Sequence, residues 1–420
     1  MKSKRWMRFA AVGAVAGLVV ALAAGSAGAG GDAPDRESNG ELKYGFLLPQ
    51  TGALDFLGPP MIDAANMAIE EINAAGGVNG APAVSTLADD GTDPDVANAA
   101  TDRLLQEDVD VIVGAAASGV TLSVIDKITG AGVVECSPSN TGVQFTTYPD
   151  KGRYFRTAPP DNLQSQVLAD LIVDDGNEDV VIVARSDEYG EGFAEFLEKE
   201  LNDAGADVAD VILYETAEGT VYDDVAEQIA DADPEAVAMI AFDEGGAVLT
   251  AAIEAGVGPA DVQWYGTDGI QSSTFFEKVD PNDATVVEGI RGTAPSAAPA
   301  DGEETFVERF QAFSPGTDTI FSGHSYDCVV IAALAATAAE SDASQDIAAG
   351  INAVTKKGTK CSLYADCVAL LEDGEDINYQ GAAGPLDFTK KGEPGKGAYD
   401  TWEFGADGSV EIIDESIAAG

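Results

Sequence analysis

Two loops rich in hydroxyl side chains lie close together in the sequence, and each follows a short apolar segment. The segment 109–113 leads through small residues to Ser118, and the segment 133–134 leads to the run SPSNT at 137–141. If both segments are parallel strands joined by a helix, both loops lie at the carboxyl edge of a sheet, where α/β proteins bind ligands. Ser118 is then placed to cap that helix, whose free N–H groups favour an anion such as a carboxylate. An ordinary helix cap and an ordinary turn are the alternative interpretation.

The elements that must position these loops are predicted from an alternation of apolar and amphipathic segments along the chain. Strands are expected at 42–48, 84–88, 109–113, 133–134, 180–184, 208–214, 237–242 and 263–265. Helices are expected at 61–75, 95–106, 121–129, 162–174, 193–204, 223–230, 247–255, 303–313, 325–340 and 347–354. Alternating strands and helices predict parallel sheets covered by helices, an α/β fold. The plan of strand, polar loop and helix recurs in both halves, which favours two similar lobes over one sheet.

The N-terminus has the features of a secretory signal peptide. Four basic residues precede the apolar run 9–24, and Ala27-Gly28-Ala29 has the pattern of a cleavage site. We therefore expect residues 1–29 to be a signal peptide, residues 30–40 to be a linker, and the mature protein to be exported to the periplasm or the cell exterior. No cysteine lies beside the cleavage site, so lipid attachment there is not expected. No second apolar run approaches the length of about 18 residues that a membrane span needs.

The chain is strongly acidic, with 22 basic and 73 acidic residues among 420 and a formal net charge of −51. Nucleic-acid binding relies on basic residues, so this charge argues against a nucleic-acid partner. A high negative charge favours solubility in a saline setting, and it does not identify a ligand.

Four cysteines in an exported chain suggest disulfides, for which three connectivities exist. Cys361 and Cys367 lie close together in a polar segment, and we expect them to pair. Cys136 and Cys328 either form a second bridge or are buried thiols. The single histidine, His324, is expected to be structural, and no Cys-x-x-Cys motif is present. The sequence also lacks a Gly-x-Ser-x-Gly elbow and a phosphate-binding loop, so we expect no metal site, no cofactor and no enzymatic activity.

A series of motifs then resembles a known family. In chain order they are YGFLLPQTGALDFLG, AANMAIEEINAAGGVNG, DDGTDPDVA, VIVGAAASGVTLSV, SPSNT, YFRTAPPDNLQ, DEYGEG, YGTDG and HSYD. Together, from about residue 41 to 413, they resemble the type I periplasmic substrate-binding proteins. Within that group the chain is similar to the branched-chain amino acid (Leu/Ile/Val)-binding proteins of ABC importers.

The resemblance implies two Rossmann-like lobes joined by three hinge crossings, with a ligand enclosed in the cleft between the lobes. The crossings are expected near 157–159, 292–294 and 384–386. Lobe 1 is then expected to contain residues 41–157 and 293–383, and lobe 2 to contain residues 158–292 and 384–420.

The resemblance also implies a set of ligand-binding residues. Ser118 matches a serine that binds the ligand carboxylate, and Asp268 matches an acidic residue that pairs with the ammonium. The remaining matches are a loop beside the carboxylate and ammonium, a lobe 2 tyrosine, two aromatic residues beside the side-chain pocket, and the acid of a segment, 242–244, that aligns loosely with another aromatic or an acid. They are Ser139, Asn140, Thr141, Tyr189, Phe56, Tyr326 and Glu244. A free amino acid is a zwitterion, so neutral donors for one end and a carboxylate for the other suit it.

Each of these residues also has a structural interpretation. Asp268 precedes a glycine as turn residues often do, Tyr189 could lie on a lobe surface, and Tyr326 and Phe56 could simply pack against neighbours. Asp161 is expected to cap a helix rather than to touch a ligand. An aspartate in the YGTDG motif, where the family has the longer glutamate, and Asn140, where a small apolar residue is common, leave the solute open among amino acids, amides and small organic acids.

The function implied by the resemblance is capture of a small solute by lobe closure and its delivery to an ABC importer. The expected partners are the solute and the permease subunits, and the protein is expected to be a monomer. The alternative is an extracytoplasmic ligand sensor on the same fold that signals through a membrane partner.

Overall fold

The computed structural model describes residues 34–217, 219–296 and 305–420, so the expected signal peptide and the start of the expected linker lie outside the described residues. The first of its two large sheets has five parallel strands in the order β2-β1-β3-β4-β5. Their bounds are β1 (Lys43–Leu48), β2 (Val84–Asp89), β3 (Val111–Gly114), β4 (Val134–Ser137) and β5 (Tyr154–Arg156). We call this sheet and its helices lobe 1.

The second large sheet has seven strands in the order β15-β14-β10-β9-β8-β6-β7. Strands β6 to β10 pair in parallel, whereas β14 and β15 are antiparallel additions at one edge. The bounds are β6 (Asp179–Arg185), β7 (Asp207–Tyr214), β8 (Ala236–Ile240), β9 (Gln263–Gly266), β10 (Arg291–Pro295), β14 (Gly397–Phe404) and β15 (Val410–Ala419). We call this sheet and its helices lobe 2, and the expectation of two parallel-sheet lobes is confirmed.

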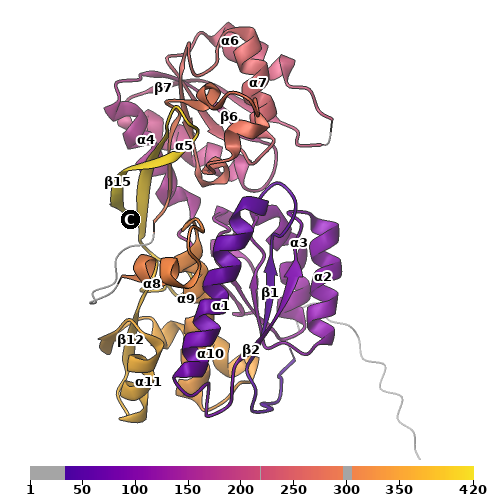
Figure 1. Cartoon of the computed structure of the whole chain (residues 1–420), viewed down its shortest axis with the longest axis vertical. Coiled ribbons are helices and arrows are strands. Elements are labelled where there is room, and N and C mark those ends of the chain that lie inside the picture. Colours follow the sequence, from indigo (N-terminus) through magenta and orange to yellow (C-terminus); the bar gives the residue numbers. More distant parts are fainter. Residues whose placement is uncertain (1–33, 218, 297–304) are drawn as a thin grey trace, which may run out of the picture. The chain divides into compact units, whose positions relative to one another are not determined.

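Helices separate the strands as the α/β alternation predicts (Figure 1). Those of lobe 1 are α1 (Gly58–Ala74), α2 (Pro94–Gln106), α3 (Ser118–Gly130), α8 (Phe306–Phe313), α9 (Ser322–Ala339), α10 (Ser344–Val354) and α11 (Tyr364–Glu372). Those of lobe 2 are α4 (Asp161–Asp174), α5 (Gly190–Ala204), α6 (Asp223–Ala232) and α7 (Gly245–Ala255). A small sheet of β11 (Thr359–Cys361), β12 (Ile377–Gly381) and β13 (Gly384–Pro385) lies beside α11 (Figure 1). None of the described helices is long and apolar enough to cross a membrane.

The chain passes from one lobe to the other later than the motifs suggest at two of the three crossings. The expected boundary at residue 293 falls inside β10, which pairs with β9 at Arg291 and Gly292 and with β14 as far as Pro295. The expected boundary at residue 384 falls in β13, and Leu386 and Phe388 still pack in the lobe 1 core. The lobe 2 strand β14 begins only at Gly397. The resemblance implied crossings at these places, but strand pairing keeps residues up to Pro295 in the lobe 2 sheet, and core packing keeps residues up to Phe388 in lobe 1.

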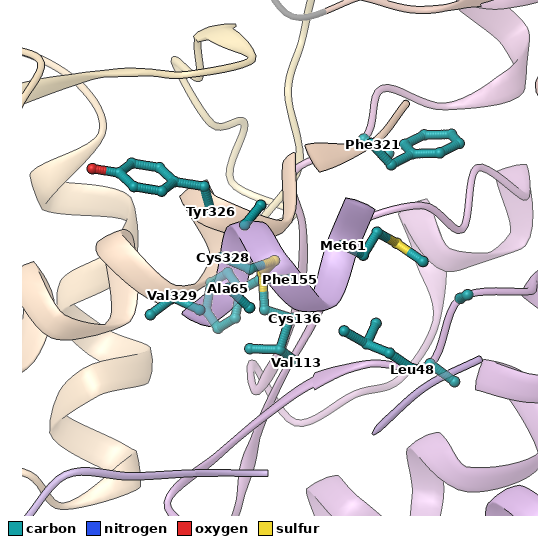
Figure 2. Close-up of a cluster of buried hydrophobic side chains, with 14 of the residues drawn as sticks. Leu48, Met61, Ala65, Val113, Cys136, Phe155, Phe321, Tyr326, Cys328 and Val329 are labelled. Carbon is teal, nitrogen blue, oxygen red and sulfur yellow. A yellow bond between two sulfur atoms is a disulfide. The ribbon is translucent and has the colours of Figure 1, made fainter. Parts of the chain in front are cut away.

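The core of lobe 1 is built around α9, which is buried along most of its length (Figure 2). Its alanine-rich sequence leaves little side-chain bulk, so the neighbouring elements approach it closely. Tyr44 of β1 donates a hydrogen bond to the Val329 carbonyl at 2.8 Å. A disulfide joins Cys136 of β4 to Cys328 of α9, and a second joins Cys361 to Cys367. The expected pairing of Cys361 with Cys367 is present, and of the two possibilities for Cys136 and Cys328 the structure has the bridge.

Candidate functional site

One pocket brings together residues from both lobes, and five of the nine predicted ligand-binding residues line it. These five are Ser118, Ser139, Thr141, Tyr189 and Asp268. The first three follow strands β3 and β4 of lobe 1, and the last two follow β6 and β9 of lobe 2. The pocket therefore lies at the carboxyl ends of parallel strands, where this class of fold binds ligands.

The lobe 1 side of the pocket presents hydroxyl groups and the N-terminus of α3. Ser118 is the first residue of α3, and Ala117 occupies the cap position, so the expectation that Ser118 caps the helix was wrong. Instead, Ser118 Oγ accepts a hydrogen bond of 3.1 Å from the Gly142 backbone N–H. This contact leaves the hydroxyl proton available to a ligand. No side chain caps α3, and an uncapped helix N-terminus favours a negatively charged group.

Two adjacent aspartates, Asp89 and Asp90, accept hydrogen bonds that hold the backbone on the lobe 1 side of the pocket. Asp90 accepts hydrogen bonds from the Ala116 N–H at 3.1 Å and from the Thr92 N–H at 2.8 Å. Burial raises the pKa of Asp90 to about 6, against the lowering effect of these two N–H groups. Asp89 accepts bonds from Thr51 and other groups of the loop after β1. Asp90 thus fixes the backbone at Ala116, and Asp89 fixes the loop after β1.

The lobe 2 side carries the carboxylate of Asp268, which is only 5% exposed. Gln164 of α4 donates a hydrogen bond of 2.8 Å from Nε2 to Asp268 Oδ1. Burial raises the pKa of Asp268 to about 6, and the hydrogen bonds from Gln164 and Tyr189 oppose that rise. The Tyr189 hydroxyl also lies 2.8 Å from Thr267 Oγ1. Asp268 is therefore a positioned anion at the pocket surface.

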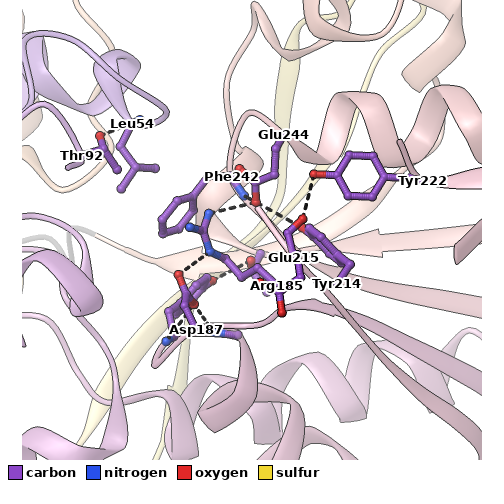
Figure 3. A network of polar contacts seen from close by, with 12 residues as sticks. Leu54, Thr92, Arg185, Asp187, Tyr214, Glu215, Tyr222, Phe242 and Glu244 are labelled. Carbon is purple, nitrogen blue, oxygen red and sulfur yellow. Dashed lines mark hydrogen bonds and ion pairs between the residues drawn. The ribbon is translucent and has the colours of Figure 1, made fainter. Parts of the chain in front are cut away.

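An aromatic wall completes the lobe 2 side. The rings of Tyr189 and Phe242 are stacked, with centroids 5.4 Å apart and an interplanar angle of 18°. The guanidinium of Arg185 lies over the Phe242 ring, 3.6 Å from its centroid. Arg185 also forms ion pairs with Asp187 at 2.6 Å and Glu244 at 2.9 Å (Figure 3). The buried guanidinium of Arg185, paired with two carboxylates, thus packs on Phe242 and stabilises the aromatic wall.

Four predicted ligand-binding residues do not line this pocket. Glu244 accepts hydrogen bonds from Arg185, Tyr214 and the Phe242 N–H, so its role in the structure is to support the wall (Figure 3). Asn140 is buried, donates to Thr121 at 2.8 Å and accepts from the Tyr154 hydroxyl. Its amide therefore points into lobe 1.

The other two are aromatic residues of lobe 1. Tyr326 is fully buried in α9, packs edge-on against Phe306 and donates its hydroxyl proton to Glu71. Phe56 is half-buried and packs against the lobe 1 core. In both cases packing places the ring elsewhere.

The structure adds pocket residues that the motif comparison did not single out. They are Leu54, Leu57, Ala116, Ala117 and Gly269. Phe242, the aromatic residue of the loosely aligned segment 242–244, lines the pocket as well. A Cβ at Gly269 would lie 2.3 Å from the Ala241 carbonyl oxygen, so only glycine fits beside the wall. Leu54 and Leu57 lie on either side of Phe56 in the sequence. The signal that could have identified them was the apolar character of this loop as a whole, and not its single aromatic residue. Gln164 showed no signal of its own, because its partner Asp268 lies 104 residues away.

Asp161 does not cap α4, contrary to expectation. It is the first helical residue, Pro160 holds the cap position, and neither carboxylate oxygen has a hydrogen-bond partner among the described residues. Burial raises its pKa to about 8.

The chemistry of the pocket is that of binding. It offers hydroxyl donors and a helix N-terminus on one side, a carboxylate on the other, and leucine, alanine and aromatic surface between them. Within the described part of the chain no cluster of three or more histidine, cysteine or acidic residues is arranged to hold a metal.

Comparison with known proteins identifies the family of this chain. A family model described as "Periplasmic binding protein" matches residues 41–391. The Leu/Ile/Val-binding protein homolog 1 of Brucella melitensis is 28% identical over 89% of this chain and 94% of its own length. The leucine-, isoleucine-, valine-, threonine- and alanine-binding protein of Pseudomonas aeruginosa is 30% identical over 70% of this chain and 77% of its own length.

The fold is likewise that of solved substrate-binding proteins. The crystal structure of the branched-chain amino acid transporter substrate binding protein LivJ from Streptococcus pneumoniae, in complex with isoleucine, superposes with a TM-score of 0.72. It is 21% identical, and the match covers 90% of this chain and 99% of that one. The protein thus belongs to the periplasmic binding protein family, whose members are extracytoplasmic binding proteins rather than enzymes.

Proposed function

We propose that this protein captures a free amino acid with an apolar side chain and delivers it to an ABC importer. The observation that carries the proposal is the placement of Ser118 and Asp268 in one pocket, on different lobes. A zwitterionic amino acid would extend its carboxylate toward Ser118 and the N-terminus of α3, and its ammonium toward Asp268. Each contact involves an ionised group, and such hydrogen bonds are the stronger ones.

The side chain of the solute would then lie against apolar surface. Leu54, Leu57 and Phe242 line the same pocket, and burial of apolar area contributes about 25 cal/mol per Å². The Pseudomonas aeruginosa relative is named for binding leucine, isoleucine, valine, threonine and alanine, which supports an amino acid as the solute of this chain. Residues on both lobes would contact the solute, so its binding would favour a closed arrangement of the lobes.

The proposal is tested by a thermal-stability panel of amino acids, their amides and small organic acids, with the mature protein. A ligand at a hundredfold excess over its dissociation constant adds about 2.7 kcal/mol to the free energy of unfolding. We expect one or a few apolar amino acids to raise the melting temperature, and their amides, which lack the carboxylate, to have no effect. A flat response across the panel would contradict the proposal.

The residue assignment has its own test. Ser118→Ala and Asp268→Asn should each weaken binding of the best amino acid by about tenfold to a hundredfold, the range expected for one hydrogen bond to a charged group. Ser123→Ala is the matched control for Ser118, because Ser123 lies on the same helix and donates to the Val120 carbonyl. Asp210→Asn, on the exposed edge strand β7, is the control for Asp268. Unchanged affinity in both site variants would overturn the assignment.

The partner would be the membrane-embedded permease. A cell that lacks this gene should lose uptake of the radiolabelled amino acid, and a plasmid copy should restore it. A copy carrying Asp268→Asn should not. Restoration of uptake by that variant at low solute concentration would argue for another role of the binding site, such as sensing.

A further inference from the structure

A second, larger cavity lies where the chain passes between the two sheets. Its volume is about 510 Å³, within the range of about 300–1,000 Å³ that small-molecule pockets occupy. We call it the crossing cavity, and its principal lining residues are Thr157, Pro159, His324, Leu386, Asp387 and Lys396. Residues 157–159 follow β5 of lobe 1, residues 394–398 lead into β14 of lobe 2, and Ala418 belongs to β15. It shares no lining residue with the pocket that holds Ser118 and Asp268.

The only histidine of the chain lines this cavity. His324 is 2% exposed, and its imidazole forms no hydrogen bond with any other described residue. Its backbone carbonyl, in contrast, accepts a hydrogen bond of 2.8 Å from Thr157 Oγ1, which fixes the residue in place. Burial lowers the pKa of His324 to about 3, so the imidazole is neutral at physiological pH. A neutral imidazole has one donor and one acceptor nitrogen, and both are open to hydrogen bonding by a molecule in the cavity that His324 lines.

The remaining lining carries no net charge. Asp387 and Lys396 are both exposed at the cavity and do not form an ion pair with each other in the described structure. With one charge of each sign, they give the cavity no net charge. The rest of the surface is contributed largely by proline, alanine and glycine, with one leucine. A neutral donor–acceptor pair within an apolar enclosure is complementary to an uncharged polar group on an apolar body.

We propose that the crossing cavity is a second binding site, which takes an uncharged small molecule carrying an amide or hydroxyl group, with His324 as its hydrogen-bond partner. This class differs from the zwitterion proposed for the pocket between Ser118 and Asp268. The two proposed sites therefore take ligands of different chemical classes. Failure of the assignment at one site leaves the assignment at the other intact.

The experiment uses the histidine as its own reporter. Because the chain contains one histidine, protein produced without a histidine tag has a single set of imidazole resonances that needs no assignment. Benzamide is the probe, and benzoate is the matched control, since it has the same shape and one negative charge. We expect benzamide to shift the imidazole Hε1 and ring nitrogen resonances saturably, with a midpoint of about 1 mM or below. Benzoate should require at least tenfold more.

A cavity-filling variant locates the effect. Ala418→Trp places a large ring at the cavity from an exposed position and should abolish the benzamide shift; Ala398→Leu is a second, smaller obstruction. Ala255→Trp, at the exposed end of α7, is the control and should keep the shift. Near-ultraviolet circular dichroism reports whether each variant retains its fold.

Three results would overturn the proposal. They are the absence of any benzamide shift, an equal response to benzoate, and a shift that survives both cavity-filling variants in folded protein. Competition provides a further check. A saturating amino acid found in the stability panel should leave the benzamide shift in place, and loss of the shift would show that the two ligands do not bind independently, which would also overturn the proposal.

Discussion

Gln164 Nε2 donates to Asp268 Oδ1 across 2.8 Å, and this bond joins the first turns of α4 to the loop that follows β9. The same amide nitrogen donates to the Thr293 carbonyl at 3.0 Å. Gln164 therefore ties the proposed ammonium-binding carboxylate to β10, the last lobe 2 strand before the chain returns to lobe 1. One oxygen of Asp268 is held in this way.

The affinity for an amino acid should depend on pH through Asp268. Burial raises the pKa of this carboxyl to about 6, and only the ionised form attracts an ammonium group. Affinity should be constant above about pH 7 and should fall about tenfold per pH unit below pH 6, because a proton competes with the ligand. Calorimetric titrations from pH 4.5 to 8 measure this profile. Asp268→Asn should bind weakly at every pH, and a wild-type profile that stays flat down to pH 4.5 would exclude the carboxylate from the site.

Burial of Asp161 should make stability decline as the pH rises. The pKa of Asp161 is raised to about 8 in the folded protein, against about 3.9 for an unperturbed aspartate. The folded state thus holds this proton between about pH 4 and 8 while the unfolded state releases it. The stabilising contribution is present below pH 4 and is lost as the pH approaches 8. Asp161→Asn cannot ionise, so in urea titrations its stability relative to wild type should increase from pH 5 to pH 8. A constant difference would contradict the assignment.

Removing Arg185 should destabilise lobe 2 and disturb the aromatic wall. Loss of one partner from a buried ion pair costs about 3–5 kcal/mol, because the remaining charges are left unpaired. Arg185→Met should therefore lower the free energy of unfolding by about 3 kcal/mol, and the added substitution Glu244→Gln should recover part of that loss. The control Lys199→Met breaks an exposed pair with Asp203 and should leave the urea midpoint unchanged. Equal effects of the two single substitutions would show that burial of the network is unimportant.

The two disulfides should contribute unequally. The Cys136–Cys328 bridge spans a sequence separation of 192, whereas Cys361–Cys367 spans 6. In the chain-entropy model the long loop is worth about 5 kcal/mol and the short one about 2 kcal/mol. Urea unfolding of the two double-alanine variants compares them directly. A larger loss from the short loop would indicate that native-state contacts, rather than loop closure, set their value.

Salt should stabilise the protein. A formal charge of −51 repels itself in the folded state, and the screening length falls from about 10 Å at 0.1 M to about 3 Å at 1 M salt. The melting temperature should rise by about 5 °C or more over that range. Sorbitol at matched osmolality is the control, because it does not screen charge. An equal rise in sorbitol would attribute the effect to solvent exclusion.

The sequence predicted most of the architecture because strand and helix periodicities are local. Pro94 begins α2 as its type suggests, and Asp93 caps that helix by accepting bonds from the next two N–H groups that follow. The crossings were harder to predict, since β10 and the segment after β13 owe their lobe membership to pairing with β14 and to core packing. Such contacts join residues about a hundred positions apart, and a single sequence does not report them.

The predicted site residues also fall into a group that the sequence located correctly and a group that it did not. Small polar residues directly after strands, such as Ser118 and Asp268, have positions set by the sheet edge, and both line the pocket. The aromatic residues Phe56 and Tyr326 have long side chains whose direction depends on tertiary packing, and both pack elsewhere. Glu244 had the right chemistry for a ligand contact, but it belongs to an ion-pair network with Arg185.

The Cys136–Cys328 bridge also makes the polypeptide a closed covalent ring over the part that contains α4 to α7 and strands β6 to β10. A protease that cuts one exposed loop of lobe 2, for example near Val221, which is 78% exposed, opens this ring without dividing the molecule. The two fragments would migrate as one species in gel electrophoresis until a reductant is added. A cell envelope rich in proteases would therefore contain nicked copies whose halves remain joined, and whose lobes stay together for as long as the bridge is oxidised.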